Sequence, residues 1–222
     1  MREKAILRTL AYADIFDYPL KENEIYRFLI SNFQFPIPKE SREAGISKFQ
    51  KELLALSSEV SQKDGFYFLK GREKIVPLRK KREQWSREKL KIAKRVASWL
   101  KLIPTIQMVA VTGALAMNNS DKEDDIDLFI ITSANRLWLS RGLVVTFLRL
   151  TGHYWRPGKI KNKICPNMLL DESHLKIPKK EQDLFSAHEF CQLKLVWDRN
   201  KTYQKFVKEN QWVKRFLPNW KL

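Results

Sequence analysis

An acidic cluster stands out in a strongly basic chain. Residues 118–128 read NNSDKEDDIDL and hold five carboxylates. If the run DIDLFIIT forms a β-strand, Asp125 and Asp127 project from one face, and the apolar residues between them enter a core. Two adjacent carboxylates repel each other unless a cation lies between them, and hard oxygen ligands of this kind suit Mg²⁺. The pattern therefore predicts a metal site at Asp125 and Asp127. A solvated turn is the alternative, but an Asp-Ile-Asp pair inside an apolar run costs free energy unless something binds it.

A glycine precedes this cluster at a suggestive place. The apolar run IQMVAVT ends at Gly113, and the short segment ALAMNN follows with a helical composition. Glycine lets the backbone come close to a phosphate, and the first amides of a helix point toward an anion. We therefore expect Gly113 and Ala114 to form the phosphate side of the site.

The two elements together resemble the signature of the nucleotidyltransferase superfamily related to DNA polymerase β. That signature is an apolar strand, Gly followed by Gly or Ser, a spacer of about ten residues, and then Asp, apolar, Asp or Glu, apolar. Here VTGALAMNNSDKEDDIDLF supplies Gly113-Ala114, ten intervening residues and Asp125-Ile126-Asp127-Leu128. The resemblance covers about residues 104–170.

The resemblance implies a reaction and its cofactors. Two Mg²⁺ ions would be held by Asp125 and Asp127, and a hydroxyl would attack the α-phosphate of an NTP, with ATP the expected nucleotide, so that pyrophosphate leaves. In the basic loop HYWRPGKIKNK, Lys159 and Lys161 would neutralise the triphosphate, although such a loop is also typical of a solvated connector.

Two departures from the signature bear on catalysis. Position 114 is Ala, which removes a hydroxyl contact to phosphate. The family often supplies a third carboxylate from a later strand, and the strand-like run KICPNMLL carries Asn167 in its middle, followed by Asp171 at its end. We expect Asn167 as the third metal ligand, with Asp171 or a site of only two carboxylates as the alternatives.

The N-terminal residues have a different pattern. Apolar residues at helical spacing predict helices over 4–14, 21–31 and 41–56, and the turn Asp64-Gly65 predicts a β-hairpin after them. Three helices followed by a hairpin resemble a winged helix-turn-helix domain over residues 1–72. The resemblance implies DNA binding, but such domains also act in protein interaction or packing.

A basic connector follows the N-terminal domain. Between residues 70 and 101, thirteen Lys or Arg face three Glu, so this segment carries a net charge of +10, within a total of +17 for the chain. Ile92, Val96, Trp99 and Ile103 recur at helical spacing, which predicts an amphipathic helix docked on a core. We expect its basic surface to contact DNA or RNA through phosphates, without reading sequence.

These elements predict an α+β chain of 222 residues. The expected parts are a winged helix-turn-helix-like domain (1–72), a basic connecting helix (73–103), a small mixed-sheet nucleotidyltransferase core (104–178) and a C-terminal helical extension (179–222), in which 180–216 read as helix. The leading function is Mg²⁺-dependent transfer of an NMP from an NTP to a hydroxyl acceptor. The alternative is a DNA-binding regulator with a nucleotide-sensing or inert nucleotidyltransferase-like domain.

Composition also indicates the compartment. The most apolar windows are shorter than the ~20 residues of a membrane-spanning helix, and the N-terminus has no uninterrupted apolar signal segment. Cys165 and Cys191 show no metal-binding or disulfide spacing. We therefore expect a cytoplasmic protein with no membrane partner and with its thiols reduced.

Overall fold

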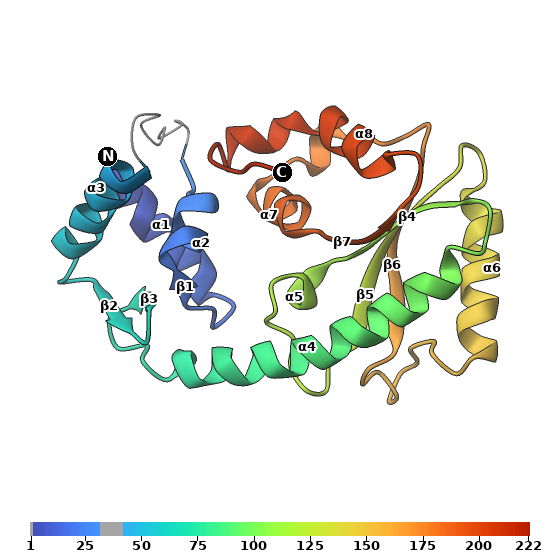
Figure 1. The fold of residues 1–222 in the computed structure, drawn as a ribbon, viewed down its shortest axis with the longest axis horizontal. Helices are drawn as coiled ribbons and strands as arrows, with labels where there is room; N and C mark the ends of the chain where they lie inside the picture. Colours follow the sequence, from blue (N-terminus) through green and yellow to red (C-terminus); the bar gives the residue numbers. More distant parts are fainter. Residues whose placement is uncertain (1, 32–41) are drawn as a thin grey trace. The chain divides into compact units, whose positions relative to one another are not determined.

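The chain folds as an α+β protein with two separate sheets. The computed structural model describes residues 2–31 and 42–222. Over these residues it has eight α-helices, a three-stranded antiparallel sheet and a four-stranded mixed sheet (Figure 1). Two compact units are present, one formed by Met1–Lys81 with Trp212–Leu222 and the other by Arg82–Gln211. The Pro-containing segment 33–40, expected as a loop before the third helix, lies outside the described residues.

The first unit combines three helices with the smaller sheet. Its elements are α1 (Arg2–Asp14), β1 (Leu20–Lys21), α2 (Glu22–Arg27), α3 (Arg42–Ala55), β2 (Val60–Lys63) and β3 (Phe66–Leu69), and the strands lie in the order β1-β3-β2. The predicted hairpin is confirmed: Asp64 and Gly65 both have positive φ, as a tight turn between twisted strands requires. The sequence analysis missed β1, because a strand of two residues has no periodicity.

The predicted connecting helix is confirmed as α4 (Ile75–Leu100), which begins in the first unit and continues into the second. Its buried stripe is formed by Ala93, Val96 and Leu100. The expectation that the helix is basic everywhere else holds only in part. Arg79 and Lys89 are each 2% exposed, so two of its cations are buried inside the fold.

The second unit is built on the sheet β6-β5-β4-β7. Its strands are β4 (Ile106–Val111), β5 (Ile126–Thr132), β6 (Ile164–Asp171) and β7 (Lys194–Asp198). Strand β4 is antiparallel to both of its neighbours, whereas β5 and β6 are parallel and are joined through α6 (Leu137–Leu150). The short helix α5 (Gly113–Ala116) follows β4 directly. All six residues of β4 are buried, which is the pattern of a central strand with both faces covered.

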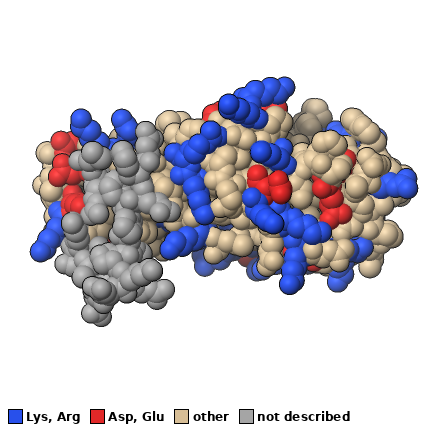
Figure 2. Space-filling view, turned by 90° about the horizontal axis from the view of Figure 1, so that it is seen from above, with Lys and Arg blue, Asp and Glu red and all other residues tan. Residues whose placement is uncertain are grey.

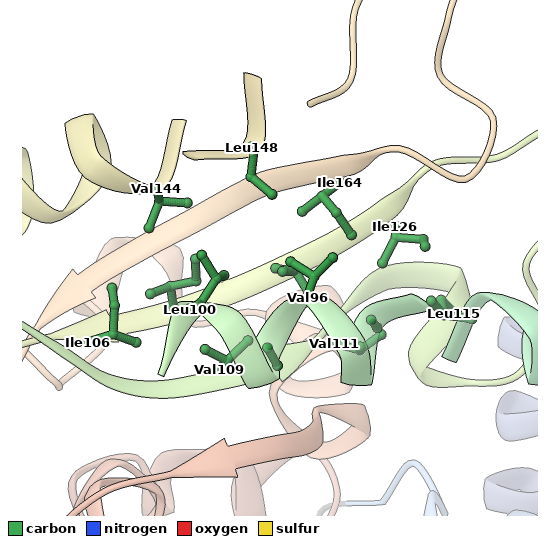
Figure 3. Close-up of a cluster of buried hydrophobic side chains, with 14 of the residues drawn as sticks. Val96, Leu100, Ile106, Val109, Val111, Leu115, Ile126, Val144, Leu148 and Ile164 are labelled. Atoms are coloured by element: carbon green, nitrogen blue, oxygen red, sulfur yellow. The ribbon is translucent and has the colours of Figure 1, made fainter. Parts of the chain in front are cut away.

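Helices cover the two faces of this sheet. On one face, side chains of α4 and α6 meet those of the strands, as Figure 3 shows for Val96, Val144 and Ile164. On the other face, Phe129 of β5 contacts Phe206, with ring centroids 5.1 Å apart. Ile126 and Leu128 are fully buried, so the predicted alternation of apolar and acidic residues in β5 is confirmed.

The prediction of continuous helix over 180–216 is wrong. A 3₁₀ turn (Lys179–Glu181) leads to α7 (Leu184–Gln192), strand β7 interrupts the helical region, and α8 (Thr202–Glu209) and a second 3₁₀ turn (Gln211–Arg215) follow. The run KLVWD is rich in residues that favour strands, and it pairs with the open edge of β4. Leu195, within the region expected as helix, is therefore a strand residue.

Candidate active site

The turn after β4 places Gly113 against Asp127. Gly113 has φ of +64°, and a Cβ atom on it would lie 3.1 Å from Oδ2 of Asp127. The amide of Thr112 donates to the backbone carbonyl of Asp127 at 3.1 Å. A residue with a side chain would meet both an unfavourable backbone conformation and the carboxylate, so this position needs glycine. The glycine turn and the acidic pair, separated by ten residues in sequence, thus form one site.

Two strands bring three potential metal ligands together. Asp125 directly precedes β5 and Asp127 lies within it. Cys165 of β6 is the residue paired with Asp127 across the parallel strands. One ligand atom from each of these three side chains lies within 4.8 Å of the other two. The donor set fits a divalent cation, since carboxylates and a thiol are both metal ligands in proteins.

Burial makes this cluster electrostatically unfavourable without a cation. Burial, reinforced by the negative charge of Asp125, raises the pKa of Asp127 to about 6. The pKa of Asp125 is also raised by burial, against a smaller opposing effect of the Lys89 charge. Burial and the two carboxylates raise the pKa of the Cys165 thiol to about 12. All three shifts disfavour negative charge here, so a bound cation would stabilise the ionised forms of these groups.

Hydrogen bonds from Lys89 of α4 hold the acidic loop that precedes Asp125. Its ammonium group donates to the backbone carbonyls of Lys122 and Asp124, at 3.3 and 2.5 Å, and to the side-chain oxygen of Asn162 at 3.0 Å. The carboxylate of Asp124 in turn accepts from the amide of Asp121 at 2.6 Å. The loop that leads into Asp125 is therefore held by buried hydrogen bonds. Lys89 is one of the thirteen cations of the basic connector, but its position four residues before Ala93 places it on the buried stripe.

A third carboxylate reaches the glycine turn from α7. Glu189 accepts a hydrogen bond from the Thr112 hydroxyl at 2.8 Å and from the Gly113 amide at 3.3 Å. Its charge contributes to the raised pKa of Asp127. Glu189 thus occupies the amide that the sequence analysis assigned to phosphate. No sequence pattern around Glu189 indicates this role, because the contact joins residues that are far apart in the chain.

The remaining predicted residues lie at different distances from the cluster. Ala114 follows Gly113 in α5. Asn167 is exposed on β6, and the β5–β6 register shifts between Asp127 and Phe129, so Cys165 and not Asn167 is the residue opposite Asp127. Asp171 pairs with Thr132, five residues along β5 from Asp127, or about 16 Å at the rise of a strand. Asp171 is therefore too distant to share a metal ion with Asp127.

The two lysines assigned to the triphosphate lie in the loop before β6. Lys161 forms an ion pair with Glu123 of the acidic loop, with Nζ 2.8 Å from Oε1. Lys159 is exposed, and its backbone pairs with that of Arg156 in an isolated β-bridge. A side-chain contact thus holds Lys161 close to the acidic segment.

Comparisons with protein-family models, with curated proteins and with solved structures found no match. Among the described residues, no helix is both long enough and apolar enough to span a membrane.

Proposed function

We propose that this protein is a nucleotidyltransferase that moves an NMP from an NTP, with ATP the expected donor, to a hydroxyl acceptor. The observation that carries the proposal is the contact between the glycine turn and the acidic pair, in which Gly113 lies against the carboxylate of Asp127. The order of elements also supports it, since a buried strand leads into a glycine turn, and an adjacent antiparallel strand carries Asp127 and follows directly after Asp125.

The residues of the chain have separate tasks in this proposal. Asp125 and Asp127 hold divalent cations, which when bound polarise the triphosphate and lower the pKa of the attacking hydroxyl. Gly113 and Ala114 offer backbone amides to the phosphates, and Glu189 must release the Gly113 amide for this contact to form. Lys161, held beside the acidic loop by Glu123, adds positive charge at the edge of the site.

Labelled nucleotides test the proposed reaction. The protein is incubated with Mg²⁺ and ATP labelled at either the α- or the γ-phosphate, together with candidate small-molecule, protein and RNA acceptors. Nucleotidyl transfer moves the α-label to the acceptor and releases the γ-label in pyrophosphate. The matched control is the variant Asp125→Asn/Asp127→Asn, which should transfer nothing. Transfer of the γ-label would instead mean phosphoryl transfer and would contradict the proposal.

A DNA-binding regulator is the second candidate. The first unit has three helices and a three-stranded antiparallel sheet, which supports the winged helix-turn-helix resemblance. Lys and Arg side chains are numerous on the face in Figure 2. In α4, the exposed cations are Lys80, Lys81, Arg87, Lys91, Lys94 and Arg95. Duplex binding that persists in the Asp125→Asn/Asp127→Asn variant, without any nucleotide transfer, would favour this second function.

A further inference from the structure

The ligand set at the acidic pair is mixed in its chemistry. Asp125 and Asp127 supply hard oxygen donors, whereas Cys165 supplies sulfur, which is a soft donor. Mg²⁺ takes oxygen ligands and completes its shell with water and phosphate, so a thiol contributes nothing to its binding. Zn²⁺ binds Cys sulfur at about 2.3 Å and carboxylate oxygen at about 2.0–2.2 Å, so it can use all three groups. The donor atoms therefore discriminate between cations.

The position of Cys165 is fixed by the sheet. Its pairing with Asp127 in adjacent parallel strands sets the two side chains next to each other on one face, and Ile126 and Ile164 form the neighbouring pair on the opposite, buried face. Ligands at bond lengths of about 2.0–2.3 Å from one ion span roughly 4 Å. Atoms that already lie within 4.8 Å of one another are thus close to ligating distance. Three protein ligands with a fourth position open is the arrangement of catalytic zinc sites.

The negative charges of Asp125 and Asp127 also favour a bound cation. Among the described residues, no Lys, Arg or His forms an ion pair with Asp125 or Asp127. The buried ammonium of Lys89 donates to backbone carbonyls and an amide side chain instead. Partly buried carboxylates are normally paired or coordinate a metal. The lack of an ion pair at the two aspartates does not depend on Cys165, and it also favours a bound cation.

We propose that Asp125, Asp127 and Cys165 together hold one thiophilic divalent cation of the Zn²⁺ class, and that Cys165 makes the site prefer such an ion to Mg²⁺. The inference rests on the part of the proposed function in which the aspartates hold a divalent cation. On binding, a metal–sulfur bond forms and the thiol proton passes to solvent.

Cadmium is a direct probe of this site, because a Cd²⁺–thiolate bond has an ultraviolet charge-transfer absorption that carboxylates do not produce. The full-length, metal-free protein is titrated with Cd²⁺ alone, and absorption is recorded. The variants are Cys165→Ser, which removes the proposed ligand, and Cys191→Ala, which removes the chain's other thiol, in α7. A further variant, Cys165→Asp, converts the site to three carboxylates.

The expected result is a saturable absorption band in the wild type and in Cys191→Ala, and no band in Cys165→Ser. Affinity for Cd²⁺ and Zn²⁺ should fall by at least about 10-fold in Cys165→Ser, which is the loss that even an outer-sphere partner causes. A large molar excess of Mg²⁺ should leave the wild-type band intact. Cys165→Asp should lose the band and gain affinity for Mg²⁺, measured by calorimetry.

A band that survives in Cys165→Ser, is missing from the wild type, or disappears on addition of Mg²⁺ would overturn the inference. The Cd²⁺ titration tests the cation assignment, and the labelled-nucleotide assay tests the proposed function, so either can fail without the other. If the α-label is transferred with Mg²⁺ but no band forms, the enzyme proposal stands and the cation assignment fails. If the band forms and no label moves with either Mg²⁺ or Zn²⁺, the cation assignment stands and the enzyme proposal fails.

Discussion

Oδ2 of Asp127 lies 3.1 Å from the position that a Cβ atom would take on Gly113. The same glycine donates its amide to Glu189. One residue without a side chain is therefore in contact with two carboxylates that reach it from a strand and from a helix. Its neighbours, and not only its backbone conformation, determine what can occupy this position.

Gly113→Ala should damage both stability and the site. Alanine at φ of +64° costs about 1–2 kcal/mol relative to glycine, and the added methyl group would displace the Asp127 carboxylate. We expect a lower urea midpoint and weaker divalent-cation binding. Gly142→Ala in α6 is the matched control, because no atom lies within 4 Å of its added Cβ and its φ is not positive. That change should stabilise the helix by about 0.5–1 kcal/mol. Unchanged cation affinity in Gly113→Ala would contradict the close contact.

The stability of the metal-free protein should respond to Asp127→Asn in a pH-dependent way. Burial raises the pKa of Asp127 to about 6 in the fold, above its ordinary value of 3.8, so its stabilising contribution is fully present below pH 3.8 and is lost as the pH rises through 6. The variant should therefore gain stability relative to the wild type across this window and keep a constant advantage above it. Thermal unfolding in a chelator, from pH 4 to 8, measures the difference.

Asp183→Asn, at the N-cap of α7, provides the control for that experiment. Hydrogen bonds, chiefly from the Ser186 amide, lower the pKa of Asp183, so its contribution is present above its ordinary pKa and is lost only as the pH falls through the lowered value. The difference from wild type should be flat between pH 5 and 8. Parallel curves for Asp127→Asn and the wild type would show that burial does not disfavour its charge.

Lys89→Met should loosen the acidic loop. Methionine keeps the length of the side chain but removes all three hydrogen bonds to the Lys122, Asp124 and Asn162 oxygens. Leaving buried acceptors unpaired should cost about 1–3 kcal/mol in the free energy of unfolding, and cation affinity at Asp125 should fall. Lys91→Met, at an exposed position of the same helix, should change stability by less than about 0.5 kcal/mol. Equal effects of the two changes in denaturant titrations would contradict a structural role for Lys89.

Glu189→Gln should tighten nucleotide binding. The amide oxygen of Gln can still accept from Thr112 and Gly113, but it brings no negative charge to repel phosphate from that amide. Calorimetry with a non-hydrolysable ATP analogue compares the variant with the wild type, and Glu181→Gln, in the 3₁₀ turn before α7, is the control. Loss of nucleotide affinity in Glu189→Gln would indicate that the carboxylate instead takes part in cation binding.

Nucleic-acid binding, if present, should depend on the exposed cations of α4. Replacing Arg87, Lys94 and Arg95 together by Ala should reduce the slope of log affinity against log salt by up to about 3, because each phosphate contact contributes about 0.9. Replacing the exposed Lys176, Lys179 and Lys180, outside α4, is the control for net charge. Fluorescence anisotropy at several salt concentrations measures both. An unchanged slope in the α4 variant would place the contact elsewhere.

Local patterns in the sequence predicted part of the arrangement seen in the fold. Strand alternation and the glycine turn indicated that Gly113, Asp125 and Asp127 would lie close together, as they do, and their binding of metal and phosphate stays a prediction. The pairing of Cys165 with Asp127 was not predicted, because the register of β6 shifts near Pro166 and a shift of one residue changes which side chain faces Asp127. Glu189 reaches the site only through tertiary packing, which local periodicity cannot indicate.

Strand β7 has a consequence for any shortened form of this protein. It covers the edge of β4, the strand that ends in the glycine turn. A chain cut at residue 178 would keep Asp125, Asp127 and Cys165, yet it would expose the backbone donors and acceptors of a strand whose residues are otherwise all buried. Such an edge is a template for pairing with other chains. Aggregation, and not only loss of activity, is therefore the expected fate of the second unit without its last strand.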